Sequence, residues 1–173
     1  MRIAITGSHR VGKTSLIEKL HQSLPDYAFR VEPYHELEDS GYFFSENPCL
    51  EDYLMQLDHS IEQITSSEDN IILDRSPLDL LAYVQATNKS DNLDFQSLYN
   101  KVKDASNEID LLVFVPIENP DLINCPESEL PELRKSVNKI LRDYVKEFNS
   151  DFNILQVAGS TDDRRDQVIQ HIS

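Results

Sequence analysis

Eight residues near the start of the chain have the types and spacing that bind phosphate. They follow the pattern Gly-x-x-x-x-Gly-Lys-[Ser/Thr] and read Gly7-Ser8-His9-Arg10-Val11-Gly12-Lys13-Thr14. In such a loop backbone N–H groups face the β-phosphate, the lysine bridges the β- and γ-phosphates, and the hydroxyl ligates Mg2+. The pattern therefore predicts that Gly7 to Ser15 bind ATP, or GTP in its place, with Lys13 as a catalytic cation and Thr14 as a metal ligand.

The residues around this loop supply the context that the pattern requires. Residues 3–6 are an apolar run ahead of it, and apolar residues recur at helical spacing from Leu16 to Leu24 behind it. Strand, loop and helix thus follow in the right order. His9 and Arg10 stand at variable positions, so we expect bystanders inside the nucleotide site; a contact of Arg10 with a phosphate or a partner is the alternative.

Two charged residues end a later apolar run. Residues 71–73 form the short run typical of a buried parallel strand, and Asp74-Arg75 follow directly. A carboxylate there can reach hydrated Mg2+, and a guanidinium can present a planar fork to phosphate oxygens. We expect Asp74 to hold the metal and Arg75 to contact substrate or the transferred phosphate, both in catalytic roles. The alternative is that they pair with each other or cap the next helix.

Glu32 comes before Pro33, at the end of an alternating segment over residues 27–31 that favours a strand. A carboxylate facing the γ-phosphate there could take the proton from an acceptor hydroxyl. We expect Glu32 to be this catalytic base. Substrate binding and capping of the loop are the alternatives, and Glu36 and Glu38 are nearby substitutes.

The elements that must position these residues alternate along the chain. Strands are expected near residues 3–6, 27–31, 71–73, 111–115 and 154–157, each followed by helical segments, one of which starts at Pro48. This alternation predicts a three-layer α/β fold, with a parallel sheet of about five strands and helices on both faces. Ligands of such sheets bind at the carboxyl ends of the strands, where Gly7, Glu32 and Asp74 all fall.

Residues 71–83, Ile-Ile-Leu-Asp-Arg-Ser-Pro-Leu-Asp-Leu-Leu-Ala-Tyr, resemble a segment of known phosphotransferases. The Asp-Arg pair is similar to that of thymidylate kinases and deoxynucleoside kinases. The longer stretch resembles small ATPases classed as AAA domains and related to the nicotinamide riboside kinase domain of NadR. The resemblance implies a P-loop kinase fold, with the acid near Mg2+ and the arginine on phosphate.

Two further features resemble deoxynucleoside kinases. Glu32-Pro33 is similar to the Glu-Pro pair whose Glu takes the proton from the substrate hydroxyl in that family. Gln56 lies eight residues after Pro48, as does the family's base-reading Gln, with Tyr53 and Gln63 on the same side of the helix. Tyr53 and Gln56 are thereby candidate substrate-binding residues; an exposed polar helix face is the alternative.

Kinases of this class place a mobile lid between the fourth and last strands, where its arginines close over the phosphates. Residues 118–142 lie in that position, and Arg134 is the first candidate for a catalytic lid arginine, ahead of Arg142. The segment departs from the family pattern because Glu127, Glu129 and Glu132 make it acidic.

Composition narrows the classes of partner. The chain has 173 residues with 31 acidic and 16 basic side chains, a formal net charge of −15 that disfavours nucleic acids and anionic membranes. Its length fits a single domain spanning residues 1–173. Cys49 and Cys125 are expected to be free thiols, and no segment suits a signal or a membrane span, so we expect a cytoplasmic protein. The sequence leaves open whether the protein forms a homodimer.

These observations predict an ATP-dependent kinase of a small metabolite, with a nucleoside or nucleotide as the leading acceptor. A regulatory ATPase or GTPase switch, with slow hydrolysis and a protein partner, is the alternative. The acidic lid and the resemblance to AAA-type ATPases favour the regulatory switch.

Overall fold

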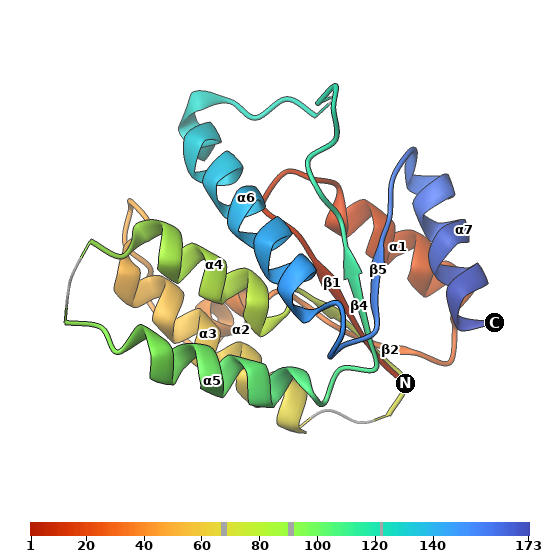
Figure 1. The fold of residues 1–173 in the computed structure, drawn as a ribbon, viewed down its shortest axis with the longest axis horizontal. Helices are drawn as coiled ribbons and strands as arrows, with labels where there is room; N and C mark the ends of the chain where they lie inside the picture. Colours follow the sequence, from red (N-terminus) through yellow and green to blue (C-terminus); the bar gives the residue numbers. More distant parts are fainter. Residues whose placement is uncertain (67–68, 90–91, 122) are drawn as a thin grey trace.

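A five-stranded parallel sheet forms the middle layer of the molecule (Figure 1). The computed structural model describes residues 1–66, 69–89, 92–121 and 123–173. The strands run in the spatial order β2-β3-β1-β4-β5, and every pairing is parallel. Their bounds are β1 Arg2–Thr6, β2 Ala28–Arg30, β3 Ile71–Asp74, β4 Leu111–Phe114 and β5 Ile154–Gln156. The prediction of a parallel sheet with about five strands is confirmed.

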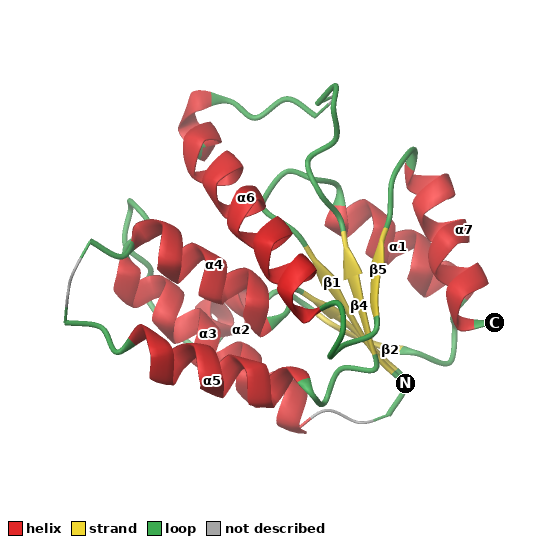
Figure 2. Cartoon of the chain, in the orientation of Figure 1, coloured by secondary structure: helices red, strands yellow, loops and turns green. Residues whose placement is uncertain are grey.

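Helices cover both faces of the sheet (Figure 2). The described helices are α1 Lys13–Ser23, α2 Pro33–Asp39, α3 Leu50–Ser66, α4 Pro77–Thr87, α5 Phe95–Ser106, α6 Pro131–Phe148 and α7 Thr161–Ile172. One face is covered by α1 and α7, and the other by α3, α4, α5 and α6, in agreement with the cluster of core residues on each face. The three-layer α/β fold is therefore confirmed.

The alternation of side chains along β1 separates the two cores. Ile3 and Ile5 are fully buried with Leu16 and Leu20 of α1, whereas Ala4 is buried with the helices of the opposite face. Successive residues of a strand point to opposite faces, so a strand covered on both sides is apolar throughout. This burial fixes β1 at the centre of the sheet. The loop that follows β1 therefore lies at the middle of the edge formed by the carboxyl ends of the strands.

A capping box fixes the start of α4 directly after β3. Ser76 is the N-cap, Pro77 takes the first helical position, and the Asp79 carboxylate accepts the backbone N–H of Ser76 at 2.9 Å. This confirms the helix start that the Ser-Pro-x-Asp spacing predicts. The turn between Asp74 and Ser76 is consequently short, and Arg75 occupies it with φ of 85°.

Two boundaries differ from expectation. Helix α2 was not predicted, because it has seven residues and buries only Pro33 and Leu37. Helix α3 begins at Leu50 rather than at Pro48. The segment 118–142 comprises a loop, a 3-10 turn at Glu127–Glu129 and the first two thirds of α6; its residue 122 lies outside the described part of the chain.

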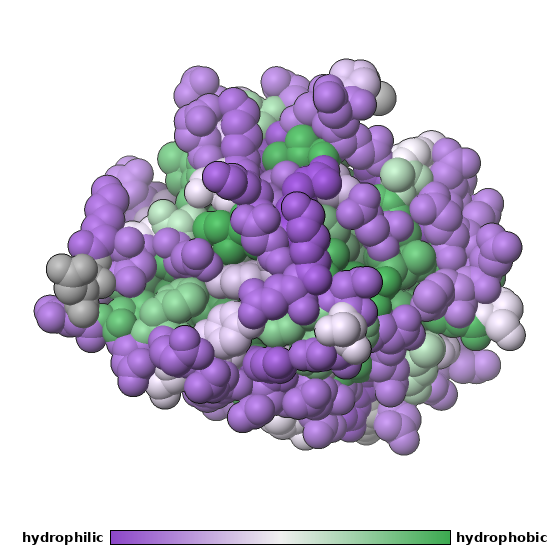
Figure 3. Space-filling model, in the orientation of Figure 1, coloured by the Kyte–Doolittle hydropathy of each residue, from purple (hydrophilic) through white to green (hydrophobic). Residues whose placement is uncertain are grey.

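Hydrophilic residues dominate the face shown in Figure 3, with apolar residues visible in patches between them. Cys49 and Cys125 are free thiols, as expected. Among the described helices, none has the length and apolarity that crossing a bilayer requires.

Candidate functional site

The loop after β1 (residues 7–15, the P-loop) has a backbone that its glycines make possible. Gly12 has φ of 88°, in the left-handed region that glycine adopts without strain. A Cβ on Gly7 would lie 2.4 Å from the carbonyl oxygen of Val115, so only glycine fits beside β4. The Gly7 N–H donates to the Asp79 carboxylate at 2.7 Å. The loop thus passes close to the end of β4 and is hydrogen-bonded to α4.

Lys13 is buried at the start of α1, and its Nζ donates to the Ser8 carbonyl at 2.8 Å. Burial, followed by the nearby charge of Arg75, lowers the pKa of Lys13 to about 8. Its ammonium group is thus held against a carbonyl of the P-loop. Thr14 is exposed at the first turn of α1.

Asp74 is a buried carboxylate with an unused oxygen. Within the described part of the chain, its Oδ1 and the Ser8 hydroxyl lack hydrogen-bond partners. Burial raises the pKa of Asp74, although the cations of Lys13 and Arg75 act in the opposite direction. An orphaned carboxylate oxygen suits a hard cation, and Mg2+ is usually held by one or two carboxylates plus substrate phosphates. The residues therefore fit Mg2+ held jointly with a phosphate ligand.

Arg75 pairs with Glu32. Its Nε donates to the Glu32 carboxylate at 2.7 Å, it lies 3.8 Å from the Asp79 carboxylate, and its guanidinium covers the Tyr83 ring at 5.4 Å. Burial raises the pKa of Glu32, but the charges of Arg75 and Lys13 outweigh it and hold that pKa below its ordinary value. Glu32 is therefore an ionised carboxylate facing the P-loop.

A cavity of about 380 Å3 opens beside this pair; we call it the larger cavity. Tyr53 and Gln56 line it and are 7% and 6% exposed, so the alternative of an exposed polar helix face is wrong. Helix α3 is covered on that side by α2 and α4. The wall consists of His9, Glu32, Tyr34, Phe44, Ser45, Glu46, Pro48, Asp52, Tyr53, Gln56, Arg75, Leu80, Tyr83, Ser128, Glu129, Leu130 and Leu133.

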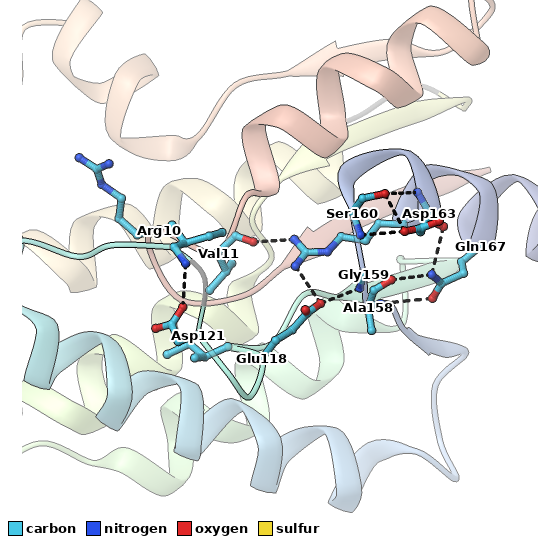
Figure 4. A network of polar contacts seen from close by, with 12 residues as sticks. Arg10, Val11, Glu118, Asp121, Ala158, Gly159, Ser160, Asp163 and Gln167 are labelled. Carbon is cyan, nitrogen blue, oxygen red and sulfur yellow. Dashed lines mark hydrogen bonds and ion pairs between the residues drawn. The ribbon is translucent and has the colours of Figure 1, made fainter.

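A second cavity of about 250 Å3, the smaller cavity, lies on the other side of the P-loop against Gly12 and Ser15. Arg164 of α7 donates to the Val11 carbonyl at 2.7 Å and to the Glu118 carboxylate at 2.9 Å. Glu118 in turn accepts the Gly159 N–H at 2.8 Å, and Figure 4 shows Val11, Glu118 and Gly159 in one polar network. Arg164 thus joins the P-loop to the loops after β4 and β5.

Arg134, the expected lid arginine, is 3% exposed and already bound. It donates to the carbonyls of His9 and Arg10 at 3.1 and 2.8 Å and forms an ion pair with Asp121. It lines the smaller cavity beside the P-loop. Arg142 donates to the Ile117 carbonyl at 2.8 Å and lines neither cavity.

His9 and Arg10 connect the P-loop to the 3-10 turn. The His9 ring lies 2.7 Å from both the Tyr83 hydroxyl and the Glu129 carbonyl oxygen, and Arg10 pairs with the Glu129 carboxylate. Burial is the main cause that lowers the pKa of His9, which favours a neutral ring. One tautomer satisfies both contacts, with Nε2–H donating to the carbonyl and Nδ1 accepting from the hydroxyl.

Four supporting residues were not identified from sequence: Asp79, Tyr83, Glu118 and Arg164. Asp79 and Tyr83 recur one helical turn apart after Arg75, and that spacing places both on the face of α4 turned toward the P-loop. Glu118 follows the fourth strand by a few residues, where ligand-side loops begin. No local signal distinguishes Arg164 from Arg165, since both stand in a polar stretch of α7.

Comparison with known proteins agrees with this geometry. A family model described as an AAA domain matches residues 2–164. Solved structures of similar fold include deoxyadenosine kinase from M. mycoides, with 20% identity, a TM-score of 0.69, and coverage of 99% of this chain and 98% of that one. Thymidylate kinase from Ehrlichia chaffeensis shares 14% identity at a TM-score of 0.69, covering 100% of this chain and 98% of that one.

The structure of NadR protein in complex with NR shares 18% identity at a TM-score of 0.64, covering 96% of this chain and 46% of that chain. No curated protein sequence gives a significant match. These identities show a shared fold only, whereas the family model covers most of the chain. The chain belongs to the AAA domain family and has the α/β fold of the P-loop nucleoside and nucleotide kinases.

Proposed function

We propose that this protein is a phosphotransferase that moves the γ-phosphoryl group of ATP, with GTP as a possible substitute, to a small metabolite. A nucleoside or nucleotide is the leading acceptor class. The observation that carries the proposal is the position of the P-loop between two cavities. Gly12 and Ser15 line the smaller cavity, while Glu32 and Arg75 line the larger one. A donor in the smaller cavity and an acceptor in the larger one would therefore lie on the two sides of the P-loop.

Each charged residue has a distinct part in this proposal. Lys13 neutralises the β- and γ-phosphates, and the P-loop N–H groups orient them. Thr14 and Asp74 would hold Mg2+, which would supply positive charge to offset that of the phosphates. Arg75 orients Glu32 and faces the transferred group. Glu32, kept ionised by Arg75 and Lys13, accepts the proton of the acceptor hydroxyl while the hydroxyl oxygen bonds to the γ-phosphorus. The bond from that phosphorus to the oxygen it shares with the β-phosphate breaks, and ADP leaves.

The form of the larger cavity supports a planar acceptor. Tyr53 lies stacked on Tyr83 with ring centroids 4.9 Å apart, and Tyr34 is stacked on Phe44 at 4.3 Å. Aromatic surfaces of this kind suit a flat heterocycle. Gln56 is positioned in the same wall to form hydrogen bonds. Solved structures of the same fold bear the names deoxyadenosine kinase and thymidylate kinase, which supports the same class.

The second candidate, a regulatory ATPase or GTPase switch, is favoured by the state of Arg134. This arginine is bound to two P-loop carbonyls and to Asp121 rather than directed at a phosphate position. If the protein is a kinase, Arg134 acts as a catalytic lid arginine only after reorienting, or it acts by shaping the P-loop. In the switch reading, hydrolysis is slow and independent of any acceptor.

Acceptor-dependent ADP release distinguishes the two candidates. The purified protein with Mg-ATP is incubated with a panel of nucleosides and nucleotides, and ADP is measured for each. The kinase reading predicts ADP formation only with particular acceptors, and Lys13→Ala abolishes it. Lys19→Ala is the matched control, since Lys19 is a partly exposed lysine on the same helix, 3.2 Å from Asp162. ADP formation that is equal with and without every acceptor would favour the switch.

A further inference from the structure

We propose that the larger cavity selects an acceptor that carries no negative charge, so that a hydroxyl-bearing nucleoside is phosphorylated in preference to its monophosphate. This inference rests on the proposed function and narrows its acceptor class. The cavity wall carries four carboxylates, Glu32, Glu46, Asp52 and Glu129, against one guanidinium, Arg75, within the described part of the chain. Glu32 is paired with Arg75 and Glu129 with Arg10, so a phosphate group entering this cavity would meet like charge chiefly at Glu46 and Asp52.

Arg75 is already committed to acidic and aromatic partners. It is 8% exposed, donates to Glu32 at 2.7 Å, lies 3.8 Å from the Asp79 carboxylate, and covers the Tyr83 ring. If Arg75 also bound an acceptor phosphate, that phosphate would place a second negative charge beside Glu32. The guanidinium is therefore placed to serve the catalytic carboxylate and the transferred group rather than an anionic acceptor.

Asp52 provides a carboxylate of the cavity wall that stays ionised. Its carboxylate accepts the backbone N–H groups of Ser45 and Cys49 at 3.2 and 3.3 Å and the Tyr42 hydroxyl at 3.1 Å. Burial raises its pKa, but these hydrogen bonds from Cys49 and Ser45 outweigh that and lower it. The Asp52 carboxylate holds the segment after Phe44 in place through these hydrogen bonds. Moving the carboxylate out of the cavity wall would break them.

The remaining walls suit an uncharged ring system. The stacked pairs Tyr53–Tyr83 and Tyr34–Phe44 and the side chains of Leu80, Leu130 and Leu133 provide apolar surface. Gln56 donates its Nε2–H to the Asp52 carbonyl at 3.2 Å, and among the described hydrogen bonds none uses its Oε1. That oxygen can accept a donor of a base. His9, held neutral by its environment, adds no cation.

The test compares matched acceptors that differ only in one phosphate. The common ribonucleosides and deoxyribonucleosides, each with its 5′-monophosphate, are supplied with Mg-ATP, and acceptor-dependent ADP formation gives kcat/KM for both members of each pair. We expect the best nucleoside to exceed its monophosphate by at least about tenfold. Faster use of a monophosphate overturns this inference and leaves the kinase function standing. Use of no acceptor of either kind overturns the proposed function, and this inference with it.

A charge reversal at the rim tests the cause of the preference. Glu46 is an exposed carboxylate of the cavity wall, and Glu46→Lys is expected to raise kcat/KM for the monophosphate relative to its nucleoside by about tenfold. Glu51→Lys is the matched control, because Glu51 is also exposed, lies on α3 and does not line the cavity. Equal shifts in both variants would contradict a role of the cavity wall.

Discussion

Lys13 is expected to titrate near pH 8, because burial of its ammonium group, and then the nearby charge of Arg75, lower its pKa to about 8. The charged form binds phosphate, so the sign of the effect is fixed: raising the pH through this value removes the proton that the nucleotide needs. We expect ATP affinity to be constant below about pH 7 and to fall by up to about tenfold per pH unit well above pH 8.

Titration calorimetry with Mg-ATP between pH 6.5 and 9.5 at constant ionic strength measures this dependence. The same series should show proton uptake on binding near pH 8.5, since bound phosphate raises the pKa of Lys13. An affinity that stays flat up to pH 9.5 would show that Lys13 remains charged without its ligand.

Glu32 is expected to act in the transfer step rather than in nucleotide binding. Glu32→Gln removes the proton acceptor but keeps the size of the side chain and a hydrogen-bond partner for Arg75. We expect kcat with an acceptor to fall by about 10²–10⁴-fold while Mg-ATP affinity changes little. Steady-state kinetics and nucleotide titration measure the two effects separately. Glu38→Gln, an exposed carboxylate on α2 outside the cavity wall, is the control; an equal loss there would argue against Glu32.

Individual site residues could be predicted from the sequence where they belong to one contiguous motif. The spacing from Gly7 to Thr14 was sufficient to expect the P-loop, because one short segment supplies all of its groups. The partner of Arg75 was not predictable in the same way, since Glu32 is 43 residues away in sequence and meets it only after β2 pairs with β3. Asp74 and Arg75 were expected either to serve the site or to pair together, and the structure pairs Arg75 with Glu32.

Helix α7 stabilises the P-loop through one buried arginine. Arg164→Ala removes the donor to the Val11 carbonyl and the partner of Glu118. We expect it to lower the free energy of unfolding by about 1–3 kcal/mol and to weaken ATP binding, because buried polar groups lose their partners. Urea denaturation and nucleotide titration measure these effects.

Arg165→Ala is the matched control for this substitution. Arg165 is the next residue of α7, and its partners Asp162 and Asp166 are exposed on the same helix. Exposed ion pairs contribute little, so the urea midpoint and the ATP affinity should both remain at the wild-type values. Equal losses of stability and ATP affinity in the two variants would mean that the Arg164 contacts are not the cause, and that either substitution simply weakens helix α7.

Helices and strands were predictable to the extent that burial repeats with a regular period. The apolar stripe of α3 was visible in the sequence, but its polar residues Tyr53, Gln56 and Gln63 are also buried, since α2 and α4 cover their side of the helix. Periodicity cannot show such covering by a neighbouring element. Helix α2 escaped prediction because it is short and mostly polar.

For the molecule as a whole, nucleotide binding should be linked to stability. A ligand at about 100 times its Kd stabilises the native state by about 2.7 kcal/mol, so Mg-ATP should shift the urea midpoint upward. Removing Mg2+ with a chelator should reduce this shift, and Asp74→Asn should make the shift insensitive to the chelator. Circular dichroism follows unfolding without tryptophan, which the chain lacks. A shift that is the same with and without Mg2+ in the native chain would contradict a metal role for Asp74.

The arrangement of the layers was predictable from alternation alone, because right-handed crossovers place all strand ends at one edge. The shapes of the two cavities were not. They depend on how the segment from Tyr42 to Pro48, the 3-10 turn and the loop after β5 fold over that edge. Local composition there signals only irregular backbone.

The strand order β2-β3-β1-β4-β5 has a consequence for the time at which the protein matures on the ribosome. The strand made first is central, and its two neighbours arrive only with residues 71–74 and 111–114. The arginines that hold the P-loop carbonyls follow later still, at positions 134 and 164. A nascent chain therefore carries its complete P-loop motif long before the rest of the site can fold around it, and a bound nucleotide would stabilise only the last steps of folding.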